Sequence, residues 1–94
     1  MLKNAHAKSE TPSVIALKWL AFMARDGEIL ERFMGLTGLS PGDIKSQANV
    51  EEFHAGLLDY LLQDESQLLA FAASEGLDPA AIMRARSQLP GFSP

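Results

Sequence analysis

The fold is decided by two stretches of sequence that resemble each other, DGEILERFMGLTGLSPGDI at residues 26–44 and DESQLLAFAASEGLDPAAI at residues 64–82. They align without a gap at an offset of 38 positions, and seven of the nineteen aligned positions are identical. The identical residues are Asp26, Leu30, Phe33, Gly38, Leu39, Pro41 and Ile44, which recur as Asp64, Leu68, Phe71, Gly76, Leu77, Pro79 and Ile82. Self-similarity of this kind predicts that one structural unit occurs twice in the chain.

Residues that can cap helices recur at the same offset. An N-cap residue offers a side-chain oxygen to a free N–H group of the first helical turn, so Ser, Thr, Asp and Asn are preferred there. Such residues precede each helical pattern in three pairs, Thr11 with Asn49, Asp26 with Asp64, and Ser40 with Asp78. Proline follows at positions 12, 41 and 79, where its missing N–H costs nothing. Asn49 with Glu52, and Asp64 with Gln67, also have the spacing of a capping box.

These signals predict six short helices and no strand, over residues 12–25, 27–36, 41–48, 50–63, 65–75 and 79–89. Gly38 and Gly76 follow the second helix of each unit, where a left-handed residue commonly ends a helix. The predicted fold class is all-α, a compact bundle of two repeated three-helix units at residues 11–48 and 49–89. We expect the units to pack through their first helices. They form one domain, residues 11–94, after a flexible N-terminal segment of residues 1–10.

The composition limits the function classes. The chain has no cysteine, which excludes disulfides and thiolate metal sites. No export signal is evident at the start. The most apolar window, residues 14–24, falls well short of the roughly 20 residues that span a bilayer. We therefore expect a cytoplasmic protein without a membrane segment.

The charge is unevenly distributed. Residues 26–80 carry eleven carboxylates against two cations, whereas residues 1–25 carry four cations against one carboxylate. An acidic middle repels the phosphate backbone of nucleic acids and suits a basic partner, or it serves solubility. We favour solubility as its explanation.

Metal binding and catalysis have little support in the sequence. Glu51 and His54 form a Glu-x-x-His pair, which is half of the motif of di-iron bundle proteins. The second pair and the two further glutamates are missing, so we interpret His54 as a solvent-facing residue. A nucleophile needs a base and an orienting partner, and no thiol, serine elbow or phosphate loop is found. We predict a protein that is not an enzyme and binds no cofactor, metal or small molecule.

The first predicted helix is apolar nearly all round from Val14 to Ala24. Such a helix is expected to be buried on every side. Either the second unit covers it, or a partner protein or a second copy of the chain does. The residues expected at such a partner interface, where Trp and Met suit an interaction hot spot, are Ile15, Trp19, Phe22, Met23 and Leu36. Leu36 is included because its counterpart Ser74 is polar.

A helix-turn-helix is the alternative interpretation. Ala72, Gly76 and Ile82 have the spacing of the small, turn and apolar residues in such DNA-binding motifs. Phosphate neutralisation dominates affinity for DNA. The only cations placed to meet phosphates there are Lys45, Arg84 and Arg86. We therefore rank nucleic-acid binding below protein binding.

The run LERFMGLTGLSP at residues 30–41, followed by LLQDE at 61–65 and LLAFA at 68–72, resembles a family of small bacterial helical proteins known only as a domain of unknown function. Its Phe-x4-Gly-Leu-x-Pro element occurs twice, at residues 33–41 and 71–79. The resemblance extends over residues 11–90 and implies a small bacterial all-α protein, without activity, ligand or site residues.

The leading hypothesis from the sequence is a non-enzymatic interaction or adaptor protein. It binds a protein partner, or itself as a homo-oligomer, through the apolar face of the first helix. The alternative is a helix-turn-helix regulator that binds nucleic acid through the third helix of a unit.

Overall fold

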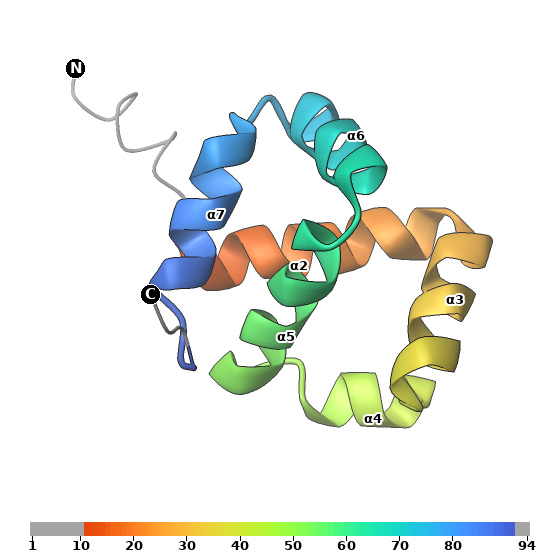
Figure 1. Cartoon of the computed structure of the whole chain (residues 1–94). Coiled ribbons are helices and arrows are strands. Elements are labelled where there is room, and N and C mark those ends of the chain that lie inside the picture. Colours follow the sequence, from red (N-terminus) through yellow and green to blue (C-terminus); the bar gives the residue numbers. More distant parts are fainter. Residues whose placement is uncertain (1–10, 92–94) are drawn as a thin grey trace, which may run out of the picture.

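The computed structural model describes residues 11–91, which form six α-helices and no strand (Figure 1). The helices are α2 (Pro12–Arg25), α3 (Gly27–Thr37), α4 (Pro41–Ser46), α5 (Glu51–Leu62), α6 (Glu65–Glu75) and α7 (Pro79–Ser87). The predicted all-α class is confirmed. The prediction for residues 1–10 lies outside the described residues. The helices predicted at 41–48, 50–63 and 79–89 are each two residues shorter than predicted, and the helix predicted at 27–36 is one residue longer.

Side chains cap five of these six helices at the positions that the sequence predicts. Thr11, Asp26, Asp64 and Asp78 each accept a hydrogen bond from an N–H group of the first turn. Ser40 caps α4 in a complete capping box with Asp43, in which each side chain accepts a bond from the other residue's N–H. This box does not follow the usual sequence pattern, because the N3 position of a capping box is normally Glu or Gln and here it is Asp43.

Helix α5 is the exception. The predicted N-cap Asn49 is wrong, because Val50 is the N-cap and no side chain bonds to the first turn. The predicted capping box between Asn49 and Glu52 is therefore not formed. The preceding loop is instead fixed by the ring of His54, whose Nε2 lies 2.7 Å from the carbonyl oxygen of Ala48.

Glycines end α3 and α6 as predicted. Gly38 has a φ of 77° and Gly76 a φ of 68°, both in the left-handed region. Only glycine adopts this conformation without a steric cost from a Cβ atom. The turn lets the chain reverse at once toward Leu39 and Leu77, which pack against the core.

The core forms where α2 crosses α5, and this pair of helices has the most extensive contact in the fold. Trp19 and Met23 of α2 are fully buried, as are Leu57, Leu58 and Leu61 of α5. Removing this apolar surface from water supplies the main free energy that favours folding.

Aromatic rings fasten α6 onto this pair. The Trp19 ring stacks on Phe22 with the centroids 5.8 Å apart, and Phe71 of α6 meets Trp19 edge-on at 5.6 Å. Phe71 also meets Phe22 edge-on, at 5.6 Å. Such pairs contribute about 0.5–1.5 kcal/mol each beyond the area that they bury.

The two sides of the α2–α5 pair are covered unequally (Figure 1). On one side, α7 packs against α2, α5 and α6 and buries Ile82 and Ala85. On the other side, α3 packs on α2, while α4 makes only sparse contacts and has no fully buried residue. The expected contact between the first helices is present. The surroundings of α4 and α7 differ, so the twofold repeat stays a prediction.

We predict that Phe71→Ala lowers the free energy of unfolding by about 3–5 kcal/mol, because it leaves a cavity against Trp19. Urea unfolding followed by circular dichroism measures the change. The matched control is Leu69→Ala on the same helix. Leu69 is 50% exposed, and its truncation should cost less than about 1 kcal/mol. Equal losses in the two variants would contradict the placement of α6.

The capping box of α4 predicts a titration. Hydrogen bonds from the backbone and side chain of Ser40 lower the pKa of Asp43 below its ordinary value of 3.8. The ionised form therefore supports the start of α4 above pH 3.8, and this support is lost as the pH falls through the folded-state pKa. An NMR titration of the Asp43 carboxyl carbon should give a midpoint below 3.8, and Ser40→Ala should return it toward 3.8. A midpoint unaffected by Ser40→Ala would contradict the box.

Candidate functional site

The structure buries three of the residues predicted at an interface on the first helix. Ile15, Trp19 and Met23 have 4%, 0% and 0% of their surface exposed. They are covered by this chain itself, through α3, α5, α6 and α7. This arrangement gives no support to a partner interface at these three residues, which stays a prediction.

Phe22 and Leu36, the other two predicted interface residues, are more exposed than these three. Phe22 is half-buried against the aromatic cluster, and the guanidinium of Arg25 lies over its ring, 5.4 Å from the centroid. Leu36 is 70% exposed near the end of α3. The structure therefore does not bring the five residues together on one surface.

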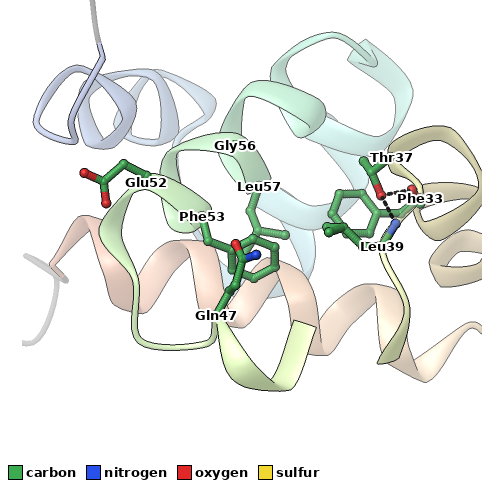
Figure 2. A pocket seen from close by; sticks show the side chains of 8 residues that line it. All are labelled: Phe33, Thr37, Leu39, Gln47, Glu52, Phe53, Gly56 and Leu57. Atoms are coloured by element: carbon green, nitrogen blue, oxygen red, sulfur yellow. Dashed lines mark hydrogen bonds between the residues drawn. The ribbon is translucent and has the colours of Figure 1, made fainter. Parts of the chain in front are cut away.

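A surface that combines apolar walls with an opening lies between the end of α3 and α5 (Figure 2). We call it the α3–α5 groove, with a volume of about 260 Å³. Its lining residues are Phe33, Thr37, Leu39, Gln47, Glu52, Phe53, Gly56 and Leu57. The exposed lining is mostly apolar, because the rings and aliphatic side chains present their edges there.

The α3 wall of the groove is held by its own hydrogen bonds. The Thr37 hydroxyl donates to the carbonyl oxygen of Phe33 at 2.8 Å and accepts from the N–H of Leu39 at 3.3 Å (Figure 2). The side chain of Leu39 is thereby fixed directly after the left-handed turn at Gly38. The wall is a preformed feature, since both its buried ring and its backbone turn are constrained.

The α5 wall presents one helical face. Glu52, Phe53, Gly56 and Leu57 lie at the i, i+1, i+4 and i+5 spacing that places residues on the same side of a helix. Gly56 is exposed in the middle of this helix, and a Cβ atom built on it would meet nothing within 4 Å. Glycine inside a helix costs about 0.5–1 kcal/mol relative to alanine. Its presence leaves the α5 side of the groove without a side chain at that position.

The charge at the groove is negative and concentrated at one end. Glu52 begins the α5 wall, and Figure 2 shows its carboxylate directed away from the Phe53 ring. Glu51 precedes it, and both side chains are exposed. Among residues 11–91, no cation forms an ion pair with either of them.

His54 does not line the groove, and its predicted exposure is wrong. The side chain is 4% exposed, with Nε2 directed at the Ala48 carbonyl oxygen and Nδ1 2.8 Å from the Ser13 hydroxyl oxygen. A carbonyl only accepts, so Nε2 donates its hydrogen, and in the neutral ring Nδ1 accepts from Ser13. The contact joins the start of α2 to the loop before α5.

A serine beside a histidine is also the pairing of a nucleophile with its base. Here the orienting third group is the Ala48 carbonyl, and the ring is enclosed by the helices that it joins. Neither Ser13 nor His54 lines the α3–α5 groove. We interpret the pair as a structural link.

Arg86 bears on the nucleic-acid alternative. It is 8% exposed, and its Nε and Nη2 donate to the two carboxylate oxygens of Asp59 at 2.6 and 3.2 Å. Its Nη1 donates to the carbonyl oxygens of Leu89 and Pro90 at 3.3 and 3.0 Å. Arg86, one of the three cations expected to meet phosphates, is therefore engaged in hydrogen bonds within the fold.

Two further features of residues 11–91 can be stated briefly. No group of three or more histidine and carboxylate side chains is placed to hold a metal ion in this part of the chain. None of its six helices has the length and apolar character needed to cross a membrane.

The groove could not be predicted from the sequence. Hydrophobic periodicity locates the helices, but it does not show where spaces remain between them after they pack. Phe33, Phe53 and Leu57 have 2%, 8% and 0% of their surface exposed, so most of each side chain lies in the core. One signal was present in the sequence. Gly56 interrupts a helical pattern without being a cap, and an interior glycine often has a packing or functional reason.

Fold and groove together define a small all-α protein with a preformed apolar groove at its surface. The chain belongs to a family described as "Protein of unknown function (DUF3572)", whose model matches residues 9–92. This family confirms the resemblance that the repeated Phe-x4-Gly-Leu-x-Pro element indicated. Comparison with curated proteins and with solved structures gives no match.

We predict that His54→Ala lowers the free energy of unfolding by about 2–4 kcal/mol, because it removes two hydrogen bonds and leaves a cavity. Ser13→Ala should cost about 1–2 kcal/mol, since it leaves only the Nδ1 atom unpaired. Urea unfolding at neutral pH measures both losses. The control Ser66→Ala, at an exposed position of α6, should stay within about 0.5 kcal/mol. A loss for His54→Ala no larger than the control would contradict the link.

Proposed function

We propose that this protein is a non-enzymatic protein-binding module whose contact surface is the α3–α5 groove. The observation that carries the proposal is the opening of about 260 Å³ between α3 and α5, at which the largely buried side chains of Phe33, Phe53 and Leu57 present their edges. The polar side chains of Thr37, Gln47 and Glu52 surround these walls. An apolar centre with a polar rim is the usual anatomy of a protein–protein interface.

The size of the groove favours a protein side chain over a cofactor or metabolite. Its volume of about 260 Å³ lies below the roughly 300–1,000 Å³ of typical small-molecule pockets. It has no cluster of polar groups that would orient a small ligand, because the Thr37 hydroxyl is engaged with its own helix. One or two apolar side chains of a partner match it better.

The proposal also includes the internal repeat, with units at residues 11–48 and 49–89. Caps at Asp26 and Asp64, and left-handed glycines at Gly38 and Gly76, support it at the same offset of 38. The units differ in their third helix, which has six residues in α4 and nine in α7. The shorter helix leaves the first unit's side of the α2–α5 pair less covered. The groove lies on that side.

The enzyme and nucleic-acid alternatives find less support. The Ser13–His54 pair is part-buried, and neither residue lines the groove. Arg86 is occupied by Asp59, and the groove carries a carboxylate at its end. A surface of this charge repels a phosphate backbone.

Site-specific photocrosslinking in the source cell tests the proposal. A benzoylphenylalanine residue at Gln47, beside the groove, should give a discrete adduct with another protein or with a second copy of this chain. The same residue at Leu69, exposed on α6, is the control and should give none. Adding Gly56→Leu should suppress the Gln47 adduct, because it places a side chain on the groove face of α5.

Three outcomes would contradict the proposal. The Gln47 position could give no adduct above that of Leu69, or an adduct that Gly56→Leu leaves unchanged. An adduct that disappears on nuclease treatment would identify nucleic acid as the ligand and restore the alternative.

A further inference from the structure

Helices α3 and α4 are attached to the rest of the fold by fewer buried side chains than any of the other four helices. We call residues 27–46 the α3–α4 arm. Phe33 is its one buried residue, whereas α5 alone contributes six. Among residues 11–91, α3 has an extensive contact with α2 only, and α4 has none (Figure 1). The other apolar side chains of the arm that pack against the core are only partly buried, and they are Ile29, Leu30, Met34, Leu39 and Ile44.

The side-chain hydrogen bonds of the arm are internal. The Thr37 hydroxyl bonds to Phe33, and Ser40 and Asp43 cap each other. The first turn of α3 bonds to Asp26, directly before the arm. Within the described residues, no hydrogen bond or ion pair joins the arm to α5, α6 or α7. The arm is therefore a constrained unit that apolar contact alone holds against α5, and such contact has no directional preference.

The helices around the arm are tied to each other by directional bonds. The Ser13 hydroxyl of α2 lies 2.8 Å from Nδ1 of His54 in α5. Arg86 of α7 donates to both carboxylate oxygens of Asp59 in α5. These bonds fix α2, α5 and α7 relative to one another and leave the position of the arm free of any such constraint.

Both ends of the arm have short connections. Asp26 is at once the C-cap of α2 and the N-cap of α3, so a single non-helical residue joins the two helices. Residues 47–50 join α4 to α5, and Nε2 of His54 holds the Ala48 carbonyl oxygen there. Hinges of moving segments are usually a few residues at the ends of secondary-structure elements. Both connections have this form.

The arm and α5 each supply one wall of the α3–α5 groove (Figure 2). Phe33 and Leu39 belong to the arm, and Phe53 and Leu57 belong to α5. The Phe33 ring also meets the Tyr60 ring of α5 edge-on, with the centroids 5.0 Å apart. Each wall is constrained within its own element, but no directional bond sets the distance between the walls. A rotation of the arm therefore changes the width of the groove.

We infer that the α3–α4 arm moves as one unit about Asp26 and residues 47–50, and that it opens and closes the groove while α2, α5, α6 and α7 stay folded. The ring contact between Phe33 and Tyr60 favours the closed position. Segments that open around ligands come from the parts of a fold with the fewest buried contacts. The regulatory consequence rests on the proposed function, because the arm then controls access to the binding surface.

Native-state hydrogen exchange of the full chain, measured by NMR in urea well below the unfolding midpoint, tests the motion. Helices α3 and α6 are matched, since each has eleven residues. Amides in the middle of α3 should exchange at least about ten-fold faster than amides in the middle of α6, because the arm opens without global unfolding. Equal exchange in the two helices would overturn the inference.

Two variants show whether the arm opens by itself. Phe33→Leu should accelerate exchange in the middle of α3 about three- to ten-fold, because it removes a ring pair and keeps an apolar side chain. Phe71→Leu on α6 should accelerate exchange in α6 and leave α3 unchanged, since opening of the arm does not disturb Phe71. If Phe71→Leu accelerates both helices equally, the chain opens as one cooperative unit and the inference is wrong.

Spin labels give a second measurement. The chain has no cysteine, so labels on introduced cysteines report only the chosen positions. Leu36→Cys with Leu69→Cys connects the arm to α6, and Leu69→Cys with Met83→Cys connects α6 to α7, all at exposed positions. The first pair should give a distance distribution at least about twice as broad as the second, because only the first pair includes the moving unit. Equal widths would contradict the motion.

The two proposals can fail separately. Faster exchange in α3, combined with no crosslink from Gln47, would keep the moving arm and remove the proposed binding function. A Gln47 crosslink combined with equal exchange in α3 and α6 would keep the groove as a binding surface and overturn the motion of the arm.

Discussion

The burial of α2 against α5 is the constraint on which the rest of the fold depends. Both helices carry too much apolar surface to remain exposed to water. Their packing against each other places Trp19 and Leu58 in the fully buried core. All remaining helices are arranged around this pair. Helices α6 and α7 cover one side closely, and α3 with the short α4 covers the other side loosely. The α3–α5 groove follows from that inequality, and its walls are the outer edges of core residues.

Much of the fold could be predicted because its signals are local. A capping side chain such as Asp26 and a left-handed glycine such as Gly38 act within a few residues, so the sequence alone reveals where helices begin and end. The start of α5 could not be predicted in this way. Its loop is fixed by the His54 ring, which reaches back to Ser13 across 41 positions of sequence. Long-range contacts of this kind produce no periodic pattern in the sequence.

The candidate site was predicted poorly for a physical reason. Apolar excess on the first helix indicated a surface in need of cover, but composition cannot say whether the cover comes from the same chain. Trp19 is covered from within. The α3–α5 groove lies beside Gln47, the C-cap residue of α4. Gly56, a glycine in the interior of α5 without a capping role, lies in this region.

The position of α7 has a consequence for the order in which the protein matures. Helix α7 is the last helix among the described residues, and it packs on α2, the first. Its Arg86 donates a hydrogen bond to Asp59, which lies 27 positions earlier in the sequence. A nascent chain therefore carries exposed apolar surface on α2 and α5 until residue 86 has left the ribosome. The hydrogen bonds of Arg86 with Asp59, Leu89 and Pro90 can therefore form only after most of the chain has been synthesised.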